Sequence, residues 1–261
     1  MRAYGTAGPT VVVLHGGPGA PGEMAPVARE LANSFRVLEP LQRGSGGEPL
    51  TVAIHVQDLR EVILEHCGAE RPSLVGYSWG AMLALAYAAE HPTSADPIVL
   101  AGCGTFDPVS RSRMQKIINE RMTPELRDSL RRLESEISDP DQRFRAVGKL
   151  IDSVYSVDPI PREESEEAAD ARGFEETWND MLRLQREGIY PAKFAAIRSP
   201  VLMLHGSFDP HPGKMIRDSL LPYLPQLEYV ELPHCGHTPW RERVARDEFF
   251  AMLRSWLARR V

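Results

Sequence analysis

The sequence has 261 residues, 43% hydrophobic and 25% charged, a composition typical of a globular protein with one sizeable core. The formal net charge is −6, and basic residues are interleaved with acidic ones, as between Arg127 and Arg132, so we expect no nucleic-acid partner. The longest apolar run, 81–89, is too short to cross a bilayer, and the N-terminus has no signal-like apolar core, so we expect no membrane partner.

Short β-rich segments recur along the chain, with helical segments between them. The expected strands are 10–14, 35–39, 73–77, 98–101, 201–204 and 227–232, and the expected amphipathic helices are 24–33, 51–67, 80–90, 213–221 and 245–259. This alternation predicts an α/β fold with a mostly parallel sheet flanked by helices. In such sheets, ligands gather at the carboxyl ends of the strands.

The β signal disappears between the strands expected at 98–101 and 201–204. Residues 105–195 form a helical, charged segment that is interrupted at Asp139-Pro140 and Asp158-Pro159. Strand alternation then resumes. We therefore predict one α/β core, made of residues 1–104 and 196–261, with a helical cap inserted at 105–195.

Three cysteines, Cys67, Cys103 and Cys235, are odd in number and widely separated. This pattern argues against a disulfide framework and against a zinc-ligand pair. We expect reduced thiols, a cytoplasmic location, and no metal ion or other cofactor.

A serine lies on the turn between an expected strand and an expected helix. Ser78 is the central residue of the sequence Gly76-Tyr77-Ser78-Trp79-Gly80. Such a turn holds the serine in strained backbone angles with its hydroxyl exposed, and the glycines let strand and helix approach closely. An ordinary glycine-bounded turn is the alternative. We interpret Ser78 as a nucleophile.

A serine nucleophile needs a histidine base and an acid that orients it. His237 lies on a glycine-containing loop just after the last expected strand, and we assign it as the base, with a packing role for His234. Asp209 follows the strand at 201–204 and is our choice for the acid. An Asx-turn role before Pro210 is the alternative for Asp209, and Asp107, after another strand, is a rival acid.

The first strong strand leads into a glycine-rich loop, 15–19, with the sequence HGGPG. Its glycines allow backbone N–H groups to face a carbonyl oxygen, so the N–H groups of Gly17 and Trp79 are the predicted oxyanion donors. A phosphate-binding turn is the alternative, but the loop lacks the Lys-Ser/Thr tail of a P-loop. Residues next to these positions are predicted substrate contacts: Gly16, Tyr77 and Trp240.

Together these motifs resemble the α/β-hydrolase superfamily, and the segments 15–19 and 76–80 resemble its proline iminopeptidase branch. The resemblance covers nearly the whole core and implies the α/β-hydrolase fold. It favours Asp209 over Asp107, because roles in this family follow the chain order nucleophile, acid, base. The segment 41–46 is similar to the branch's Asp-Gln-Arg-Gly-x-Gly, with Leu41 in place of aspartate, and implies that Arg43 braces the active-site loops. Few residues precede the first strand, so we expect a shortened sheet at its N-terminal edge.

Proline iminopeptidases bind the amino group of the substrate with acidic side chains, often from the cap. The resemblance implies this role for acidic residues of the insertion, which a solvated helix face would also explain: Glu163, Glu164, Glu166, Glu167, Asp170, Glu175 and Glu176. Pro210 stands where some relatives carry a glutamate after the triad aspartate.

The sequence therefore favours a serine hydrolase that cleaves a small ester or amide through an acyl-enzyme on Ser78. Its substrate is expected to be a small molecule or short peptide. The alternatives are an aminopeptidase that removes N-terminal proline, a carboxylesterase, and a carbon–carbon hydrolase or lyase with the same triad. A non-catalytic ligand receptor of this fold belongs to another class. For an enzyme, the rate should rise with pH through an apparent pKa near about 7, because the base must be neutral.

Overall fold

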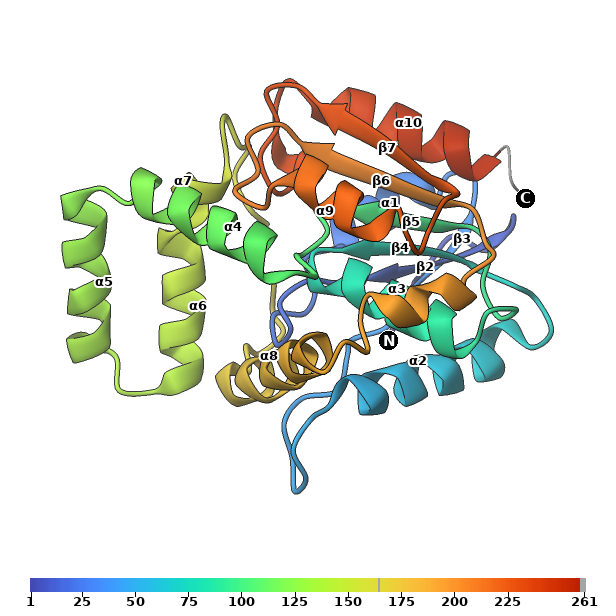
Figure 1. Ribbon diagram of the computed structural model, residues 1–261, viewed down its shortest axis with the longest axis horizontal. Helices are drawn as coiled ribbons and strands as arrows, with labels where there is room; N and C mark the ends of the chain where they lie inside the picture. The colour runs from blue at the N-terminus through green and yellow to red at the C-terminus, as the bar shows by residue number, and fades with distance from the viewer. Residues whose placement is uncertain (164, 259–261) are drawn as a thin grey trace.

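The structure, a computed structural model, describes residues 1–163 and 165–258, and its centre is a seven-stranded sheet (Figure 1). In sheet order the strands are β1 (Arg2–Tyr4), β3 (Arg36–Glu39), β2 (Thr10–Leu14), β4 (Ser73–Tyr77), β5 (Ile98–Ala101), β6 (Val201–Gly206) and β7 (Leu227–Leu232). Only β1 is antiparallel to its neighbour. The mostly parallel sheet predicted from the sequence is therefore confirmed.

All six expected strands are present, and their ends differ from the expected ones by at most two residues. The seventh, β1, was not expected. It has only three residues and pairs with the outer side of β3, so it forms the whole of the N-terminal sheet edge. A strand this short carries too few residues for an alternating pattern to be recognised.

Helices cover both faces of the sheet. On one face lie α1 (Ala25–Leu31) and α10 (Arg246–Ala258), and on the other α2 (Val52–Cys67), α3 (Trp79–Glu90), α9 (Gly213–Leu220) and the short 3₁₀ helix η1 (Ala192–Ala196). Successive side chains of a strand point to opposite faces, so both faces of β2 are apolar. Val11 and Val13 pack in the core with α1 and α10, and Val12 and Leu14 pack in the core with α2 and α3. The five expected helices are confirmed to within two residues at their described ends, whereas Arg259 lies outside the described residues.

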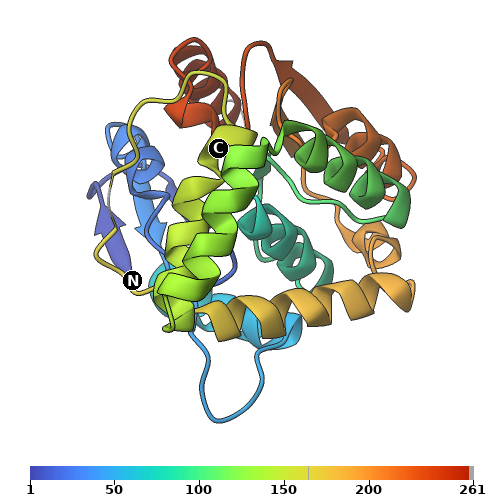
Figure 2. The same cartoon turned by 90° about the vertical axis from the view of Figure 1, so that its left-hand side faces the viewer.

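Between β5 and β6 the described part of the chain forms five α-helices before the 3₁₀ helix η1. These are α4 (Pro108–Arg121), α5 (Pro124–Glu136), α6 (Pro140–Leu150), α7 (Asp152–Tyr155) and α8 (Ala171–Arg186). Helices α4 to α7 project to one side of the sheet, and α8 returns toward it (Figures 1 and 2). Each of α4, α5 and α6 begins at a proline directly after a capping Asp or Thr. Among the described residues, no helix is long and apolar enough to span a membrane.

Two glycines permit the close approach of β4 and α3. A Cβ atom on Gly76 would overlap the backbone of Gly80, and a Cβ on Gly80 would overlap the carbonyl oxygens of Leu14 and His15. Backbone atoms in a central strand have little freedom to move away. The strand-to-helix turn therefore requires glycine at both positions.

We expect Gly80→Ala to lower the free energy of unfolding by about 3 kcal/mol, because the added methyl group meets backbone on β2. Urea denaturation followed by circular dichroism measures this change. Gly148→Ala is the matched control: Gly148 lies in α6, a Cβ there has nothing within 4 Å, and the substitution should be neutral or stabilising. Equal stability of Gly80→Ala and wild type would contradict the packing described.

Candidate active site

Ser78 occupies the turn between β4 and α3 with backbone angles φ 53° and ψ −115°. A non-glycine residue with positive φ is uncommon and marks a strained position. Its N–H donates to the carbonyl oxygen of Ala101, 2.9 Å away, which ties the turn to the end of β5. The side chain is partly exposed at the carboxyl edge of the sheet.

Three residues remote in sequence meet at this edge. The Nε2 atom of His237 lies 3.1 Å from Ser78 Oγ, and its Nδ1 atom lies 2.6 Å from Asp209 Oδ2. Because a carboxylate only accepts hydrogen bonds, Nδ1 carries the proton and Nε2 is left as an acceptor for the serine hydroxyl. The arrangement can take a proton from Ser78 while Asp209 holds the imidazole.

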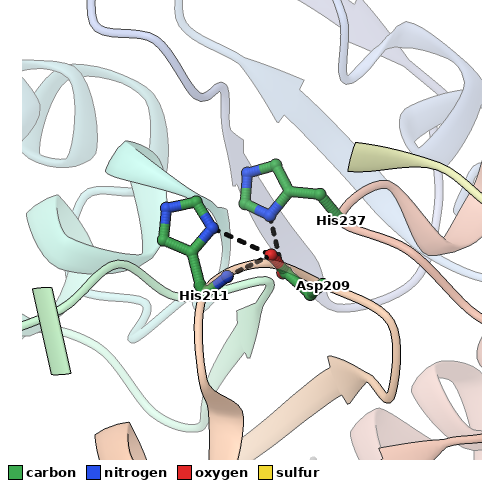
Figure 3. A group of neighbouring side chains, drawn as sticks. All are labelled: Asp209, His211 and His237. Carbon is green, nitrogen blue, oxygen red and sulfur yellow. Dashed lines mark hydrogen bonds and ion pairs between the residues drawn. The ribbon is translucent and has the colours of Figure 1, made fainter. Parts of the chain in front are cut away.

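Asp209 is buried and accepts hydrogen bonds at both oxygens (Figure 3). Oδ1 accepts from the backbone N–H of His211 at 2.9 Å and from its Nδ1 at 2.8 Å, while Oδ2 faces His237. A third histidine, His205 on β6, has its Nε2 3.2 Å from Oδ2 and donates to the carbonyl oxygen of His211. The Asx turn and the contact to His237, stated as alternatives for this residue, are both present.

Burial and charge act in opposite directions on this pair. Burial alone would raise the pKa of Asp209, but the neighbouring imidazoles of His237, His211 and His205 hold that pKa well below its usual value. Burial lowers the pKa of His237 below 6.5, although Asp209 acts to raise it. At neutral pH the geometry therefore holds an ionised carboxylate beside a neutral imidazole.

The rival residues lie elsewhere. Asp107 caps α4, and its carboxylate accepts from the N–H groups of Val109 and Ser110 at 2.9 and 2.8 Å. His234 is exposed and has φ 49°. The structure thus brings Asp209 and His237, rather than Asp107 or His234, to the serine.

The predicted oxyanion donors come from the start of α3 and from the loop after β2. Trp79 is the first residue of α3, so its N–H is one of the unpaired donors at a helix start. Gly17 has φ 102°, a conformation that favours glycine. The neighbouring N–H of Gly16 is already used, because it donates to Glu23 Oε1 at 2.8 Å.

A hydrogen-bonded network that the sequence did not reveal supports these loops. Gln42 donates its backbone N–H to His15 Nε2 at 3.2 Å, and its side-chain oxygen accepts from Trp79 Nε1 at 2.7 Å. Burial lowers the pKa of His15 to about 4, so its imidazole is neutral and supports the loop. Arg43, expected to brace the active-site loops, pairs with Asp58 of α2 at the surface through bonds of 2.7 and 2.5 Å.

Tyr77 and Trp240, predicted substrate contacts, are largely buried. Their rings meet edge to face at 4.7 Å, and the Tyr77 ring lies 5.0 Å from that of His237. The Tyr77 hydroxyl is bonded to Thr238 Oγ1 at 2.8 Å. Tyr77 therefore packs against His237, and Trp240 packs against Tyr77. A role for either residue in contacting substrate stays a prediction.

The loop that carries His237 is fastened to the end of α7. The His237 N–H donates to the carbonyl oxygen of Tyr155 at 2.8 Å. The buried carboxylate of Glu242 accepts from the N–H groups of Gly236 and Asp158 at 3.0 and 2.9 Å. Residues of the segment between β5 and β6 therefore help to position the histidine loop.

A cavity of about 520 Å³ lies between the loop after β2 and the segment that joins β5 to β6. Its lining includes Glu23, Phe144, Ile160, Arg162 and Arg241. Burial raises the pKa of Glu23, against the lowering effect of Arg162. Since Glu23 also bonds Gly16, the cavity adjoins the glycine-rich loop.

Most acidic residues that were considered for amine recognition have other partners. Glu163 pairs with Arg29 and Glu167 with Arg2. Asp170 bonds Ser45 and caps α8, and Glu176 bonds Arg172 and the N–H of Leu50. Glu166 and Glu175 are exposed, whereas Glu164 lies outside the described residues.

One group of described residues could present three ligand atoms to a metal ion: Asp209, His211 and His237, whose atoms lie within 4.8 Å of one another. Each imidazole Nδ1 is already bonded to the Asp209 carboxylate. Hydrogen bonding therefore accounts for the whole arrangement, and we do not assign a metal site to it.

The fold and this site define a hydrolase of the α/β type. The chain belongs to the alpha/beta hydrolase family, whose family model matches residues 11–251. This match confirms the fold expected from the sequence and establishes the protein as a hydrolase.

Similar proteins agree with this assignment. A proline iminopeptidase from Lactobacillus helveticus is 24% identical over 273 aligned positions, covering 95% of this chain and 90% of that protein. A pimeloyl-[acyl-carrier protein] methyl ester esterase from Nitrosomonas europaea is 24% identical over 243 positions, covering 89% and 90%. The crystal structure of VinJ, 20% identical, matches with a TM-score of 0.67 over 100% of this chain and 94% of that chain. The likeness to the proline iminopeptidase branch is thus confirmed.

Proposed function

We propose that the protein is a serine hydrolase that cleaves small esters or amides through an acyl-enzyme on Ser78. The observation that carries the proposal is the continuous hydrogen-bonded path from Ser78 Oγ through His237 to Asp209, with links of 3.1 and 2.6 Å. Serine at its ordinary pKa is a weak nucleophile, and this path supplies the base that it needs.

The proposed chemistry has two halves. Ser78 Oγ attacks the substrate carbonyl while His237 Nε2 accepts the hydroxyl proton, and that proton then passes to the leaving group. Water then attacks the acyl-enzyme carbonyl while His237 Nε2 accepts a proton from it. That proton passes to Ser78 Oγ as the acid is released. The N–H groups of Gly17 and Trp79 would stabilise the oxyanion, each by about 3 kcal/mol.

Residues 105–195 are proposed to act as a cap that selects the substrate. The cavity beside Glu23 would receive the acyl or amine part, because it adjoins the glycine-rich loop and is lined mainly by residues of this segment. A short-chain aryl ester and a proline arylamide, assayed in parallel, measure which class is cleaved. Faster turnover of the ester would support the esterase form of the proposal.

A proline-specific aminopeptidase is the second candidate. The similarity to a proline iminopeptidase along 95% of the chain favours it. Against it, four of the acidic residues considered for amine binding are already paired with arginines, backbone N–H groups or Ser45. Cleavage of the proline arylamide well above the ester would favour this candidate.

A fluorophosphonate probe tests the catalytic proposal itself. We expect one covalent adduct per chain, located on Ser78 by peptide mass spectrometry, because the probe requires an activated serine. A wild-type protein that is folded and remains unlabelled would overturn the proposal and favour a ligand receptor.

The pH at which the rate reaches half its maximum should be lower than the value near about 7 expected from the sequence alone. Burial lowers the pKa of His237 below 6.5, and the base acts only when neutral, so kcat/KM should rise with pH through a midpoint below 6.5 and then level off. Ester hydrolysis measured from pH 4.5 to 9 gives this midpoint. A midpoint above 7 would contradict the burial described.

A further inference from the structure

We propose that His211 is a positioning residue for His237, acting through the carboxylate that the two imidazoles share; this inference rests on the proposed function of Ser78. His211 Nδ1 and its backbone N–H both bond Asp209 Oδ1, at 2.8 and 2.9 Å. The other oxygen is left to face His237 Nδ1 at 2.6 Å. Figure 3 shows both side chains turned toward the same carboxylate.

The geometry fixes the rotation of the carboxylate. Pro210 has no N–H, so the first backbone donor after Asp209 is that of His211. With two donors on Oδ1, a rotation that moves Oδ2 away from His237 would break hydrogen bonds in a buried site. His211 therefore keeps Oδ2 aligned with the base.

The His211 ring also packs flat on the ring of His237. The two centroids are 4.5 Å apart with an interplanar angle of 19°, and the Tyr155 ring lies 6.0 Å from His211 and 5.6 Å from His237. The base is thus confined between neighbours while its Nε2 faces Ser78. Such confinement keeps the 3.1 Å contact in place between catalytic steps.

Several titratable groups around Asp209 do not change their charge between pH 5 and 8. Burial raises the pKa of Tyr77, Tyr155, Tyr229, Cys103 and Cys235, so they stay neutral, and Arg121 keeps its charge although burial lowers its pKa. Glu242 bonds the N–H of Gly236 beside the base. Burial lowers the pKa of His205. The His237 imidazole is therefore the group whose titration reports a change at Asp209.

Two substitutions separate the hydrogen bond from the packing. His211→Phe keeps a flat ring of similar size and removes the Nδ1 donor, whereas His211→Asn keeps a side-chain N–H. His234→Asn is the matched control, because His234 is exposed on the histidine loop and asparagine tolerates its positive φ.

We expect His211→Phe to lower kcat for an aryl ester by about tenfold or more, with KM changed less than about twofold. Without the Nδ1 donor, Asp209 becomes more basic and the imidazolium of His237 is favoured, so the midpoint of kcat/KM should move to higher pH. His211→Asn should retain most of kcat with a smaller movement of the midpoint. His234→Asn should match the wild type.

A proton NMR titration of the His237 Nδ1–H, without substrate, gives the same midpoint independently of catalysis. A midpoint equal in His211→Phe and wild type would overturn the inference, as would equal losses of kcat in the Phe and Asn variants with no pH movement. If the midpoint moves while fluorophosphonate fails to label wild-type Ser78, the positioning stands and the proposed function fails. Thermal melts establish that each variant is folded.

Discussion

Replacing Ser78 with alanine is expected to lower kcat for ester hydrolysis by about a millionfold, because the substitution removes the atom that attacks the substrate. The loss should appear without unfolding. Among the described residues Ser78 Oγ bonds His237, whereas the turn is held by the Ser78 backbone N–H, which donates to Ala101. Single-turnover assays at high enzyme concentration extend the measurable range far enough to see the residual rate.

Ser207→Ala is the matched control for this experiment. Ser207 is exposed just after β6, on the same edge of the sheet, and it lies outside the proposed machinery. The kcat of the Ser207→Ala variant should equal that of the wild type. Activity in Ser78→Ala within tenfold of wild type would exclude Ser78 as the nucleophile.

The second large effect is expected at the acid. Asp209→Asn should lower kcat by about ten-thousandfold, because the amide no longer fixes the tautomer in which His237 Nε2 accepts a proton. Asp107→Asn should leave kcat within about twofold, since asparagine caps a helix about as well as aspartate. If the two variants exchanged these effects, the assignment of Asp209 would be wrong.

The same pair of variants should differ in their pH profiles. Asp107→Asn is expected to keep the wild-type midpoint, because Asp107 is bonded to Val109 and Ser110 and not to the base. Any activity left in Asp209→Asn should rise with pH through a lower midpoint, because the carboxylate that acts to raise the pKa of His237 is gone. Rate measurements over the same pH range decide this.

Local sequence signals were sufficient for six of the seven strands and for the turn at Ser78. Central strands are buried on both faces, so they read as continuous apolar runs, and the glycines at 76 and 80 mark a backbone approach that no side chain would permit. The choice between the acids rested on the chain order nucleophile, acid, base. Asp107 followed by Pro108 is a further local signal, a helix start, that was not used for that choice.

Contacts between remote segments were not predictable in the same way. Glu23 and His211 belong to no motif, and the motif that contains Gln42 did not indicate that its side chain bonds Trp79. Each of these residues gains its partner only when loops from different strands meet at one sheet edge. The short strand β1 was missed because pairing with β3, not its own pattern, makes it a strand. Similarly, the pH midpoint could not be placed from the sequence, because only folding buries His237 and so lowers its pKa.

Trapping the acyl-enzyme tests the central claim most directly. An aryl ester is mixed with the protein, the reaction is stopped in acid within the first turnover, and peptides are analysed by mass spectrometry. We expect the acyl group on the peptide that contains Ser78, at up to one per chain. Rapid hydrolysis with no acyl group on Ser78, or with the group on another residue, would contradict the proposed mechanism.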